Sequence, residues 1–568
     1  MFKRTRNLVN IAAIITMFLI MVEPGGSAAA SDLKAVASKI LKPTAIVTTK
    51  GSTSGTVTRL NVKDQAGASD DPLKYVLFKT PGVVYEGYRT YLLPTTASPG
   101  TVTNLKVRVN YKGPAKAAQA WSWYLFNWVG NKWVKIGDNA SATSNVWKYI
   151  EFNVTVNPTN YINNLTREIR LRLVSNNPTG DAKLDFESIF VTHHSCADPL
   201  GCVAVRPGDP IHIAYLLNVP SFESKNGVLV AIDDSAGKIL NRTIKFDGVE
   251  RVNCDPALAT GDSLKMRKDA SIVAVIGTTC SSEAMAIMPG FSASGFTMVS
   301  PSNTNPSLTE PGNPNSHLGY FRTSWNDILQ GKVAAQYAYN ALGARKASTI
   351  NDQSPYSTAL EQVFVDEFTV LGGTISARET INPSDTDFST PLGSIAADPP
   401  DIIFMPVFMP AGGYIIVQAR ATAGLETVPL MATDPMLMPD VVTAAGDDVE
   451  GFLVTGLDTQ QYRPAYASNF VPAYTAKFGV APDKWGYSPF GYDAFRIIRA
   501  AIIKVAVVQP DGSLLIGRKA LRDALYATSN FIGLTGLLTC SATGDCADPA
   551  IAVYQYHAGI SDPTKIWP

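Results

Sequence analysis

Two polar turns in the second half of the chain contain residue types that could hold a small anion. The predicted strand Ile272–Gly277 is followed by Thr-Thr-Cys-Ser-Ser, which places Ser281 and Ser282 at the start of a predicted helix. The first N–H groups of a helix have no partner within it, so this helix start favours a carboxylate. Ser302 and Thr304 follow the next strand in a second polar turn. Because ligands bind at the carboxyl ends of strands in α/β sheets, we predict that both turns belong to one site.

Motifs for catalysis are scarce. The sequence has neither a Gly-x-Ser-x-Gly nucleophile turn nor a phosphate-binding P-loop. An isolated carboxylate cannot perform paired acid–base chemistry without a second one nearby. The five histidines include only one adjacent pair; they are His193, His194, His212, His317 and His557. We therefore predict a protein that is not an enzyme and that carries no cofactor and no metal.

The charge balance argues against several classes of partner. Lys plus Arg total 48 and Asp plus Glu total 48, so the formal net charge is zero. Binding to nucleic acid or to an anionic membrane usually depends on an excess of basic residues. We predict no nucleic-acid partner. With 568 residues, 46% of them hydrophobic, the chain is long enough for several domains with cores of their own.

Residues 1–30 have the pattern of a secretory signal peptide. Basic residues precede an apolar run from Leu8 to Val22, and small residues end at Ala30. The apolar run is shorter than the ~20 residues that cross a bilayer, so a membrane anchor is the weaker alternative. No cysteine lies near the expected cleavage position, so there is no lipobox. We predict a secreted or periplasmic protein.

The six cysteines fall into three neighbouring pairs. An even number of cysteines in an exported chain predicts disulfides, here Cys196–Cys202, Cys254–Cys280 and Cys540–Cys546. Metal binding is the alternative for the Cys-x5-Cys pairs, but structural zinc sites usually have tighter spacing.

The first part of the chain, residues 31–194, is predicted to be an all-β sandwich of jelly-roll type. Apolar and polar residues alternate, as in Ile169, Leu171 and Leu173 against Arg170 and Arg172. A disulfide-pinched linker is expected over residues 195–210.

Aromatic residues occur on both faces of one strand of this sandwich, in Trp-Ser-Trp-Tyr-Leu-Phe-Asn-Trp over 121–128. Only one face of a sandwich strand can be core. The other face either packs under a loop or neighbouring domain, or provides platforms for sugar rings. We therefore keep the hypothesis that the sandwich holds a cell-surface polysaccharide through Trp121, Trp123 or Trp128.

Strands alternate with helices from residue 211 to 568. This alternation predicts parallel sheets covered on both faces, and the length exceeds that of one usual lobe. We predict two α/β lobes with a cleft between them. Lobe 1 covers about 211–330 plus a later segment, and lobe 2 covers about 331–460 plus a later segment.

Several motifs of this region, in order, resemble the leucine/isoleucine/valine-binding protein family. They include Asn-Cys-Asp-Pro over 253–256, Ile-Gly-Thr-Thr-Cys-Ser-Ser over 276–282 and Ser-Pro-Ser-Asn-Thr-Asn-Pro over 300–306. The resemblance continues through Asp-Gln-Ser-Pro-Tyr over 352–356 to Gly-Leu-Thr-Gly over 533–536. It implies a periplasmic binding protein fold of type I and a solute-binding protein of an ABC importer.

The resemblance also implies roles for single residues. Cys254 and Cys280 match a structural disulfide of the family. The residues that match ligand-binding positions are Ser281, Ser282, Ser302 and Thr304 for the carboxylate of an amino acid, Asp434 for its ammonium group, and Tyr356, Phe408 and Tyr487 for the pocket walls. Phe408 replaces a tyrosine common in the family, and an aromatic of the first loop is missing unless Phe222 substitutes for it. Selectivity for branched aliphatic side chains therefore does not follow from the resemblance.

Local sequence alone leaves structural alternatives open for these residues. Instead of binding a ligand, Ser281 could serve simply as the N-cap of its helix. Asp434-Pro435 likewise has the pattern of an N-cap followed by proline at the first helical position. A zwitterion nevertheless needs one anion site and one cation site, and burying an unpaired charge is costly. Asp434 and the helix start at Ser281 would meet both needs.

The prediction for function is therefore an extracytoplasmic solute-binding protein. Its expected partners are an amino acid or a similar small zwitterion in the cleft and the membrane permease of an ABC importer. One alternative is a receptor or sensor module with the same fold, because fold does not decide function. A second is a binding protein for another small solute, tethered to cell-wall glycan.

Overall fold

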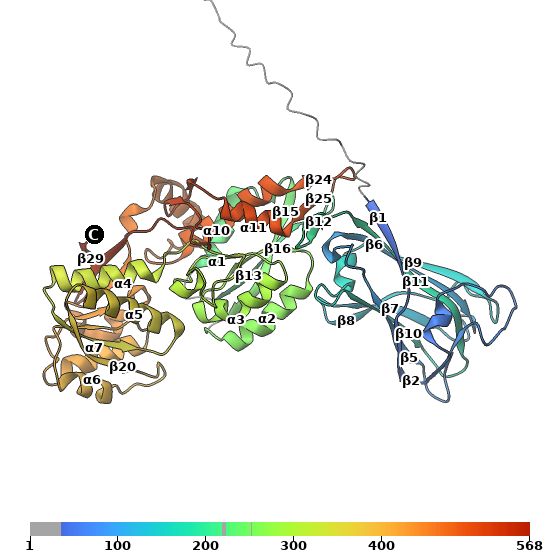
Figure 1. Cartoon of the computed structure of the whole chain (residues 1–568), viewed down its shortest axis with the longest axis horizontal. Helices are drawn as coiled ribbons and strands as arrows, with labels where there is room; N and C mark the ends of the chain where they lie inside the picture. The colour runs from blue at the N-terminus through green and yellow to red at the C-terminus, as the bar shows by residue number, and fades with distance from the viewer. Residues whose placement is uncertain (1–35, 219–222, 252) are drawn as a thin grey trace, which may run out of the picture.

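The computed structural model describes residues 36–218, 223–251 and 253–568. An N-terminal sandwich and the two lobes of an α/β unit follow one another along the molecule (Figure 1). The predicted signal peptide, residues 1–30, and Phe222 lie outside the described residues.

The N-terminal part is a sandwich of two antiparallel sheets, as the alternating sequence predicts. In β10 the side chains of Ile169, Leu171 and Leu173 are fully buried, whereas Arg170 and Arg172 face outward. One sheet has the order β3-β4-β11-β6-β9 with β1 also on β11, and the other has the order β2-β5-β10-β7-β8. The strands are β1 (Val36–Leu41), β2 (Ala45–Lys50), β3 (Ser52–Ser54), β4 (Val76–Lys79), β5 (Glu86–Leu92), β6 (Val102–Lys112), β7 (Trp121–Asn127), β8 (Lys132–Asp138), β9 (Lys148–Val154), β10 (Glu168–Ser175) and β11 (Ala182–His194).

Two of the three tryptophans considered for polysaccharide binding are core residues. Trp121 and Trp123 of β7 lie between the sheets with no exposed surface. The prediction that they contact a polysaccharide is therefore wrong. The reason is strand parity, because both share the inward face of β7 with Leu125. Trp128, just after β7, is partly exposed.

The segment after the sandwich differs from the predicted linker because part of it joins a small sheet of lobe 1. Strand β12 (Cys202–Val205) pairs with β25 (Leu514–Gly517), which also pairs with β24 (Val507–Val508). Asp198 accepts hydrogen bonds from the N–H groups of Lys519 and Ala520 at 3.1 and 2.9 Å. The connection is thus held against lobe 1 rather than free.

Lobe 1 contains a six-stranded sheet with helices on both faces. The strand order is β14-β15-β13-β16-β17-β18, parallel except for the short β14. The strands are β13 (Ile211–Asn218), β14 (Lys238–Ile239), β15 (Arg242–Arg251), β16 (Ile272–Gly277), β17 (Met298–Ser300) and β18 (Tyr320–Arg322). The helices are α1 (Ser224–Asp234), α2 (Pro256–Lys268), α3 (Ser281–Ala293), α9 (Val471–Phe478), α10 (Ser488–Val505) and α11 (Arg518–Tyr526), and a hairpin of β26 (Phe531–Ile532) and β27 (Leu537–Leu538) lies near the end.

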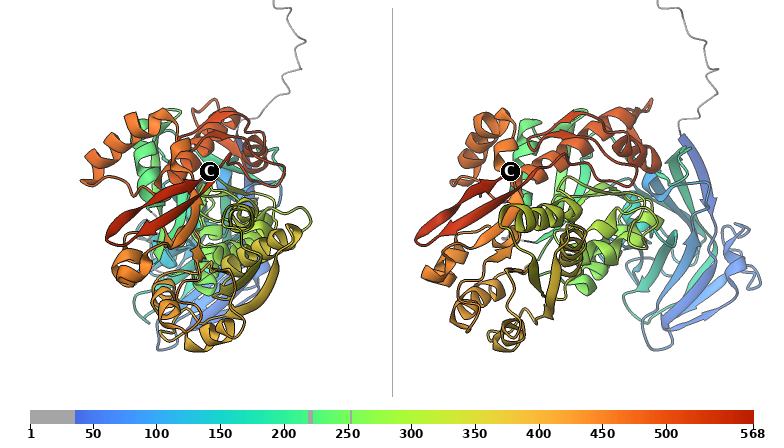
Figure 2. Two further views of the ribbon diagram at one scale, coloured as in Figure 1. Left: turned by 90° about the vertical axis from the view of Figure 1, so that its left-hand side faces the viewer. Right: turned by 60° about the vertical axis from the view of Figure 1, so that its left-hand side comes forward.

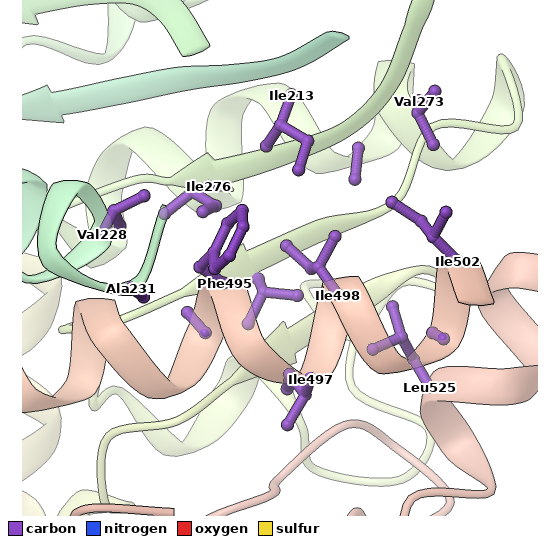
Figure 3. Packing of buried hydrophobic residues seen from close by; sticks show 14 of the residues in the cluster. Ile213, Val228, Ala231, Val273, Ile276, Phe495, Ile497, Ile498, Ile502 and Leu525 are labelled. Atoms are coloured by element: carbon purple, nitrogen blue, oxygen red, sulfur yellow. The ribbon is translucent and has the colours of Figure 1, made fainter. Parts of the chain in front are cut away.

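The core of lobe 1 shows why residues distant in sequence belong to this lobe. Phe495 and Ile498 of α10 pack under Ile213 of β13 and Ile276 of β16, together with Val228 of α1 (Figure 3). All five side chains are buried. The later segment that was predicted to complete lobe 1 thus includes α10, because its apolar face needs this sheet.

Lobe 2 has a seven-stranded sheet in the order β20-β19-β21-β22-β23-β28-β29. The first five strands are parallel, and the C-terminal hairpin adds two antiparallel strands at one edge (dark red in Figure 2). The strands are β19 (Lys346–Asn351), β20 (Thr374–Thr380), β21 (Ile402–Phe404), β22 (Leu430–Ala432), β23 (Leu453–Leu457), β28 (Ile551–His557) and β29 (Ile560–Trp567). Helices α4 (Asp327–Gln336) and α5 (Pro355–Val370) cover one face, and α6 (Ser389–Ala396), α7 (Ala411–Ala421) and α8 (Asp440–Ala445) cover the other.

The chain passes between the lobes three times within the described residues, after β18, after β23 and before β28. Arg322, at the end of β18, forms an ion pair with Asp545, which also accepts a hydrogen bond from Asn326 at 3.2 Å. The N–H of Asp458 donates to the carbonyl of Ala550 at 2.9 Å. These contacts tie the three passages together into one hinge.

All three expected disulfides are present in the structure: Cys196–Cys202, Cys254–Cys280 and Cys540–Cys546. The first closes the connection after the sandwich. The second joins the loop before α2 to the start of α3. The third closes the loop that carries Asp545, so it supports the hinge ion pair.

Candidate functional site

A cavity of about 240 Å³ lies between the two lobes. Both lobes contribute side chains to it, at the carboxyl ends of their parallel strands. The structure brings all eight residues predicted for the site to this one cavity: Ser281, Ser282, Ser302, Thr304, Tyr356, Phe408, Asp434 and Tyr487. That these residues bind a ligand stays a prediction.

The lobe 1 side of the cavity begins at the N-terminus of α3. Cys280 is the residue before the helix and its side chain does not cap the first N–H groups of α3, while Ser281 and Ser282 of this first turn line the cavity. The N–H of Asn305 donates to the Ser281 hydroxyl at 3.4 Å, and the Ser302 hydroxyl donates to the carbonyl of Thr279 at 3.0 Å. These contacts hold the two polar turns next to each other. The N-terminus of α3 and the hydroxyls of the turns together favour an anionic group at this end of the cavity.

The lobe 2 side presents the carboxyl group of Asp434, directly after β22. It accepts hydrogen bonds from Tyr487 at 2.6 Å, from Gln330 at 2.9 Å and from Tyr356 at 3.1 Å. Burial raises the pKa of Asp434, although these three donors act in the opposite direction. A cation beside this carboxylate would relieve the cost of its burial.

The sequence did not point to Asp327, a second carboxyl group near the cavity. Its side chain is fully buried at the first position of α4. Burial first, and then the nearby charge of Asp434, raise the pKa of Asp327 well above its usual range. In the sequence, Asn326-Asp327 has only the pattern of a helix start, so its nearness to Asp434 depends on how α4 packs against the sheet of lobe 2.

Aromatic rings close the cavity around Asp434. The ring centroids of Tyr356 and Phe408 are 5.3 Å apart, and those of Tyr487 and Trp325 are 5.5 Å apart. The hydroxyl of Ser354 accepts the N–H of Ser357 at 3.1 Å, which caps α5 and fixes Tyr356 in its first turn. These rings form apolar walls beside the carboxylate.

Further residues line the cavity that the sequence did not single out. Pro355 and Pro383 add apolar surface from lobe 2, and the Cys254–Cys280 disulfide adds it from lobe 1. No lysine or arginine is among the described residues that line the cavity. The site thus offers hydroxyls and helix N–H groups on the lobe 1 side, the carboxyl groups of Asp434 and Asp352 on the lobe 2 side, and apolar walls, an arrangement that suits a zwitterion.

Comparison with known proteins agrees with this architecture. The family model described as periplasmic binding protein matches residues 220–559, more than half of the chain. The chain belongs to the periplasmic binding protein family. The Pseudomonas aeruginosa amino acid binding protein is 27% identical over 271 residues, which are 47% of this chain and 69% of that protein. The Leu/Ile/Val-binding protein of Rhizobium johnstonii is 23% identical over 344 residues, 59% of this chain and 87% of that one.

A solved structure shows the same fold for this binding protein. The branched-chain amino acid transporter substrate-binding protein from Streptococcus pneumoniae, crystallised with isoleucine, is 22% identical and superposes with a TM-score of 0.53. The match covers 63% of this chain and all of that one. The predicted fold of type I for the α/β unit is therefore confirmed.

The sandwich of this binding protein resembles a different family. Residues 60–186 match the model described as N-terminal glycosyl-hydrolase-114-associated domain. Among the described residues no helix is long and apolar enough to cross a membrane.

Proposed function

We propose that this periplasmic binding protein captures an amino acid with an apolar side chain in the cleft and delivers it to the membrane permease of an ABC importer. The observation that carries the proposal is the separation of the two charge sites. Asp434 belongs to lobe 2, whereas the N-terminus of α3 belongs to lobe 1. One zwitterion that contacts both sites would favour the closed state, because contacts from both lobes are made only there.

The details of the cavity support an amino acid over other small solutes. An ammonium group beside Asp434 would donate to the carboxylate and to the hydroxyl oxygens of Tyr356 and Tyr487, which the carboxylate already orients. The carboxylate would take the N–H groups of α3 and the hydroxyls of Ser281 and Thr304. Phe408 and Pro383 would contact an apolar side chain. The names of the relatives point in the same direction.

Calorimetric titration of the full-length protein with leucine and two matched analogues tests the proposal. Isoamylamine lacks the carboxylate, and 4-methylpentanoate lacks the ammonium group. We expect leucine to bind and both analogues to bind at least about tenfold more weakly, because each leaves one polar end of the cleft without its partner. Failure of every common amino acid to bind would refute the proposal.

Asp434→Asn tests the cation site with almost no change in shape. Removing one partner of a buried ion pair costs about 3–5 kcal/mol, so leucine affinity should fall by a factor of about 100 or more. Asp440→Asn is the matched control, because Asp440 lies in the same lobe and is exposed. Equal affinities for the two variants would contradict the role of Asp434.

A further inference from the structure

The outer face of the second sandwich sheet carries a group of partly exposed aromatic rings. We call this group the aromatic face; its members are Tyr88, Tyr124, Phe126, Trp128 and Trp133. They come from three strands, β5, β7 and β8, and from the turn after β7. Their side chains point away from the core that contains Trp121 and Trp123.

The strand register makes these rings neighbours. Arg172 of β10 lies opposite Tyr88 on one side and Tyr124 on the other, and Phe126 lies opposite Trp133. The ring centroids of Phe126 and Trp133 are 5.1 Å apart, and those of Tyr88 and Trp133 are 6.0 Å apart. The aromatic face is thus one continuous patch, in which neighbouring rings are tilted or edge-on to one another.

Two arginines of β10 hold the rings in position. The guanidinium of Arg170 lies 4.6 Å from the ring centre of Trp128 and 5.9 Å from that of Phe126. The guanidinium of Arg172 lies 4.7 Å from the ring centre of Trp133. Such cation–π contacts fix the rings before any partner arrives.

The two arginines and Lys135 that lie among or beside the rings of the aromatic face are paired with carboxylates. Arg170 forms two hydrogen bonds with Glu168, at 3.0 and 3.1 Å, and Arg172 pairs with Glu86 at 3.0 Å. Lys135 pairs with Asp138 at 2.9 Å. An anionic polymer would need cationic groups without such partners. The face therefore suits a neutral partner that offers hydroxyl groups to paired donors and acceptors.

The contacts between the sandwich and lobe 1 are made by other residues than those of the aromatic face. Asn164 donates to the carbonyl of Arg267 at 2.9 Å, and Ser98 lies against Cys202. Among the described residues, none of the hydrogen bonds or ring contacts that join the sandwich to lobe 1 involves the aromatic face.

We propose that the aromatic face binds a neutral polysaccharide, with sugar rings stacked on Phe126, Trp133 and Tyr88. The apolar C–H faces of the sugars would contact the rings, and their hydroxyls would bond to the Arg–Glu pairs that lie between the rings. This second binding site is separate from the cleft, so it would hold the protein on a glycan while the lobes open and close.

Retention of the full-length protein on insoluble cellulose, chitin and mannan tests this proposal, with polygalacturonate as the anionic comparison. We expect retention on at least one neutral matrix, with little change in about 0.5 M salt, where charge attraction is screened. Retention on polygalacturonate alone, or on no matrix, would overturn the proposal. So would binding only to other proteins of an envelope extract.

Two variants connect retention to the aromatic face. Trp133→Ala removes a ring on strand β8 and should weaken retention about tenfold. Tyr149→Ala is the control, because Tyr149 is an exposed tyrosine of the other sheet and should leave retention unchanged. Phe126→Ala gives a second test if Trp133→Ala alters the circular dichroism of the sandwich. Unchanged retention in both Trp133→Ala and Phe126→Ala would refute the assignment.

Discussion

The hydroxyl of Tyr487 donates a 2.6 Å hydrogen bond to Asp434 across the boundary between the lobes. Tyr487 directly precedes α10, which packs in lobe 1, whereas Asp434 follows β22 of lobe 2. One contact therefore links the position of the lobes to the carboxyl group proposed to bind the ligand. The hydrogen bond favours the charged form of this carboxyl group, because it lowers the pKa of Asp434.

Tyr487→Phe should weaken leucine binding by a factor of about 10 to 100, because hydrogen bonds to charged groups contribute roughly 1.5–3 kcal/mol. Without this donor the pKa of Asp434 rises further, so the loss of affinity should grow as the pH falls. Calorimetric titration at several pH values measures both effects. Tyr526→Phe is the control, since Tyr526 bonds to Gly319 in lobe 1, away from the cavity. A variant with wild-type affinity would show that this contact is only structural.

The stability of the sandwich should depend on one buried ion pair. Arg89 and Glu187 have no exposed side-chain surface and share two hydrogen bonds, at 2.9 and 2.5 Å. Glu187→Gln leaves the Arg89 charge without its partner and should lower the free energy of unfolding by about 3–5 kcal/mol. Glu151→Gln, at a partly exposed pair with Arg108 on the same sheet, should change it by less than about 1 kcal/mol. Thermal unfolding of the two variants makes the comparison, and equal melting temperatures would contradict this prediction.

Glu283 should make stability depend on pH. It lies in the first turn of α3 with no exposed surface, and burial raises its pKa to about 7, partly offset by the N–H of Cys280. The folded state then holds a proton that the unfolded state has released, so the contribution of this group to stability falls as the pH rises from about 4.5 to about 7. Glu283→Gln should remove this part of the slope, roughly 3 kcal/mol over that range. Urea unfolding at several pH values measures the difference from wild type, and Glu310→Gln, at an exposed site, should retain the wild-type slope.

Close packing of α1 against α10 should make Gly491 intolerant of a side chain. A Cβ atom at Gly491 would lie 2.1 Å from the carbonyl oxygen of Ser224, so Gly491→Ala must push the helices apart. Overpacking of this kind costs about 1–3 kcal/mol. Gly261→Ala in α2 is the matched control, because nothing lies within 4 Å of its added Cβ. There alanine should stabilise the helix by about 0.5–1 kcal/mol, and a melting temperature that falls equally in both variants would disprove the packing argument.

Much of the architecture follows from local sequence. The strand Ile272–Gly277 and the start of α3 at Ser281 occur at the predicted residues, because a continuous apolar run and a polar turn are strong local signals. Each disulfide joins two consecutive cysteines of the chain, with sequence separations of 6, 26 and 6. The eight predicted site residues lie at ends of elements, and strand ends of a parallel sheet meet at one edge.

Other features depend on contacts that no local pattern contains. Trp123 and Phe126 are three residues apart in one aromatic run, yet one is core and the other lies on the outer face. The sequence shows that only one face can be buried, but the packing of the second sheet decides which one. Likewise, Asp327 has the local pattern of a helix start, and only the packing of α4 against the sheet of lobe 2 places it near Asp434.

The sequence by itself thus determined the order of the domains, the alternation of strands and helices, and the polar turns that bound the cleft, because these depend on neighbours along the chain. Tertiary structure decided which aromatic rings are exposed, which carboxyl groups approach one another, and how Tyr487 reaches Asp434. Those properties depend on the distance between residues far apart in sequence, and burial against a specific partner sets their energies.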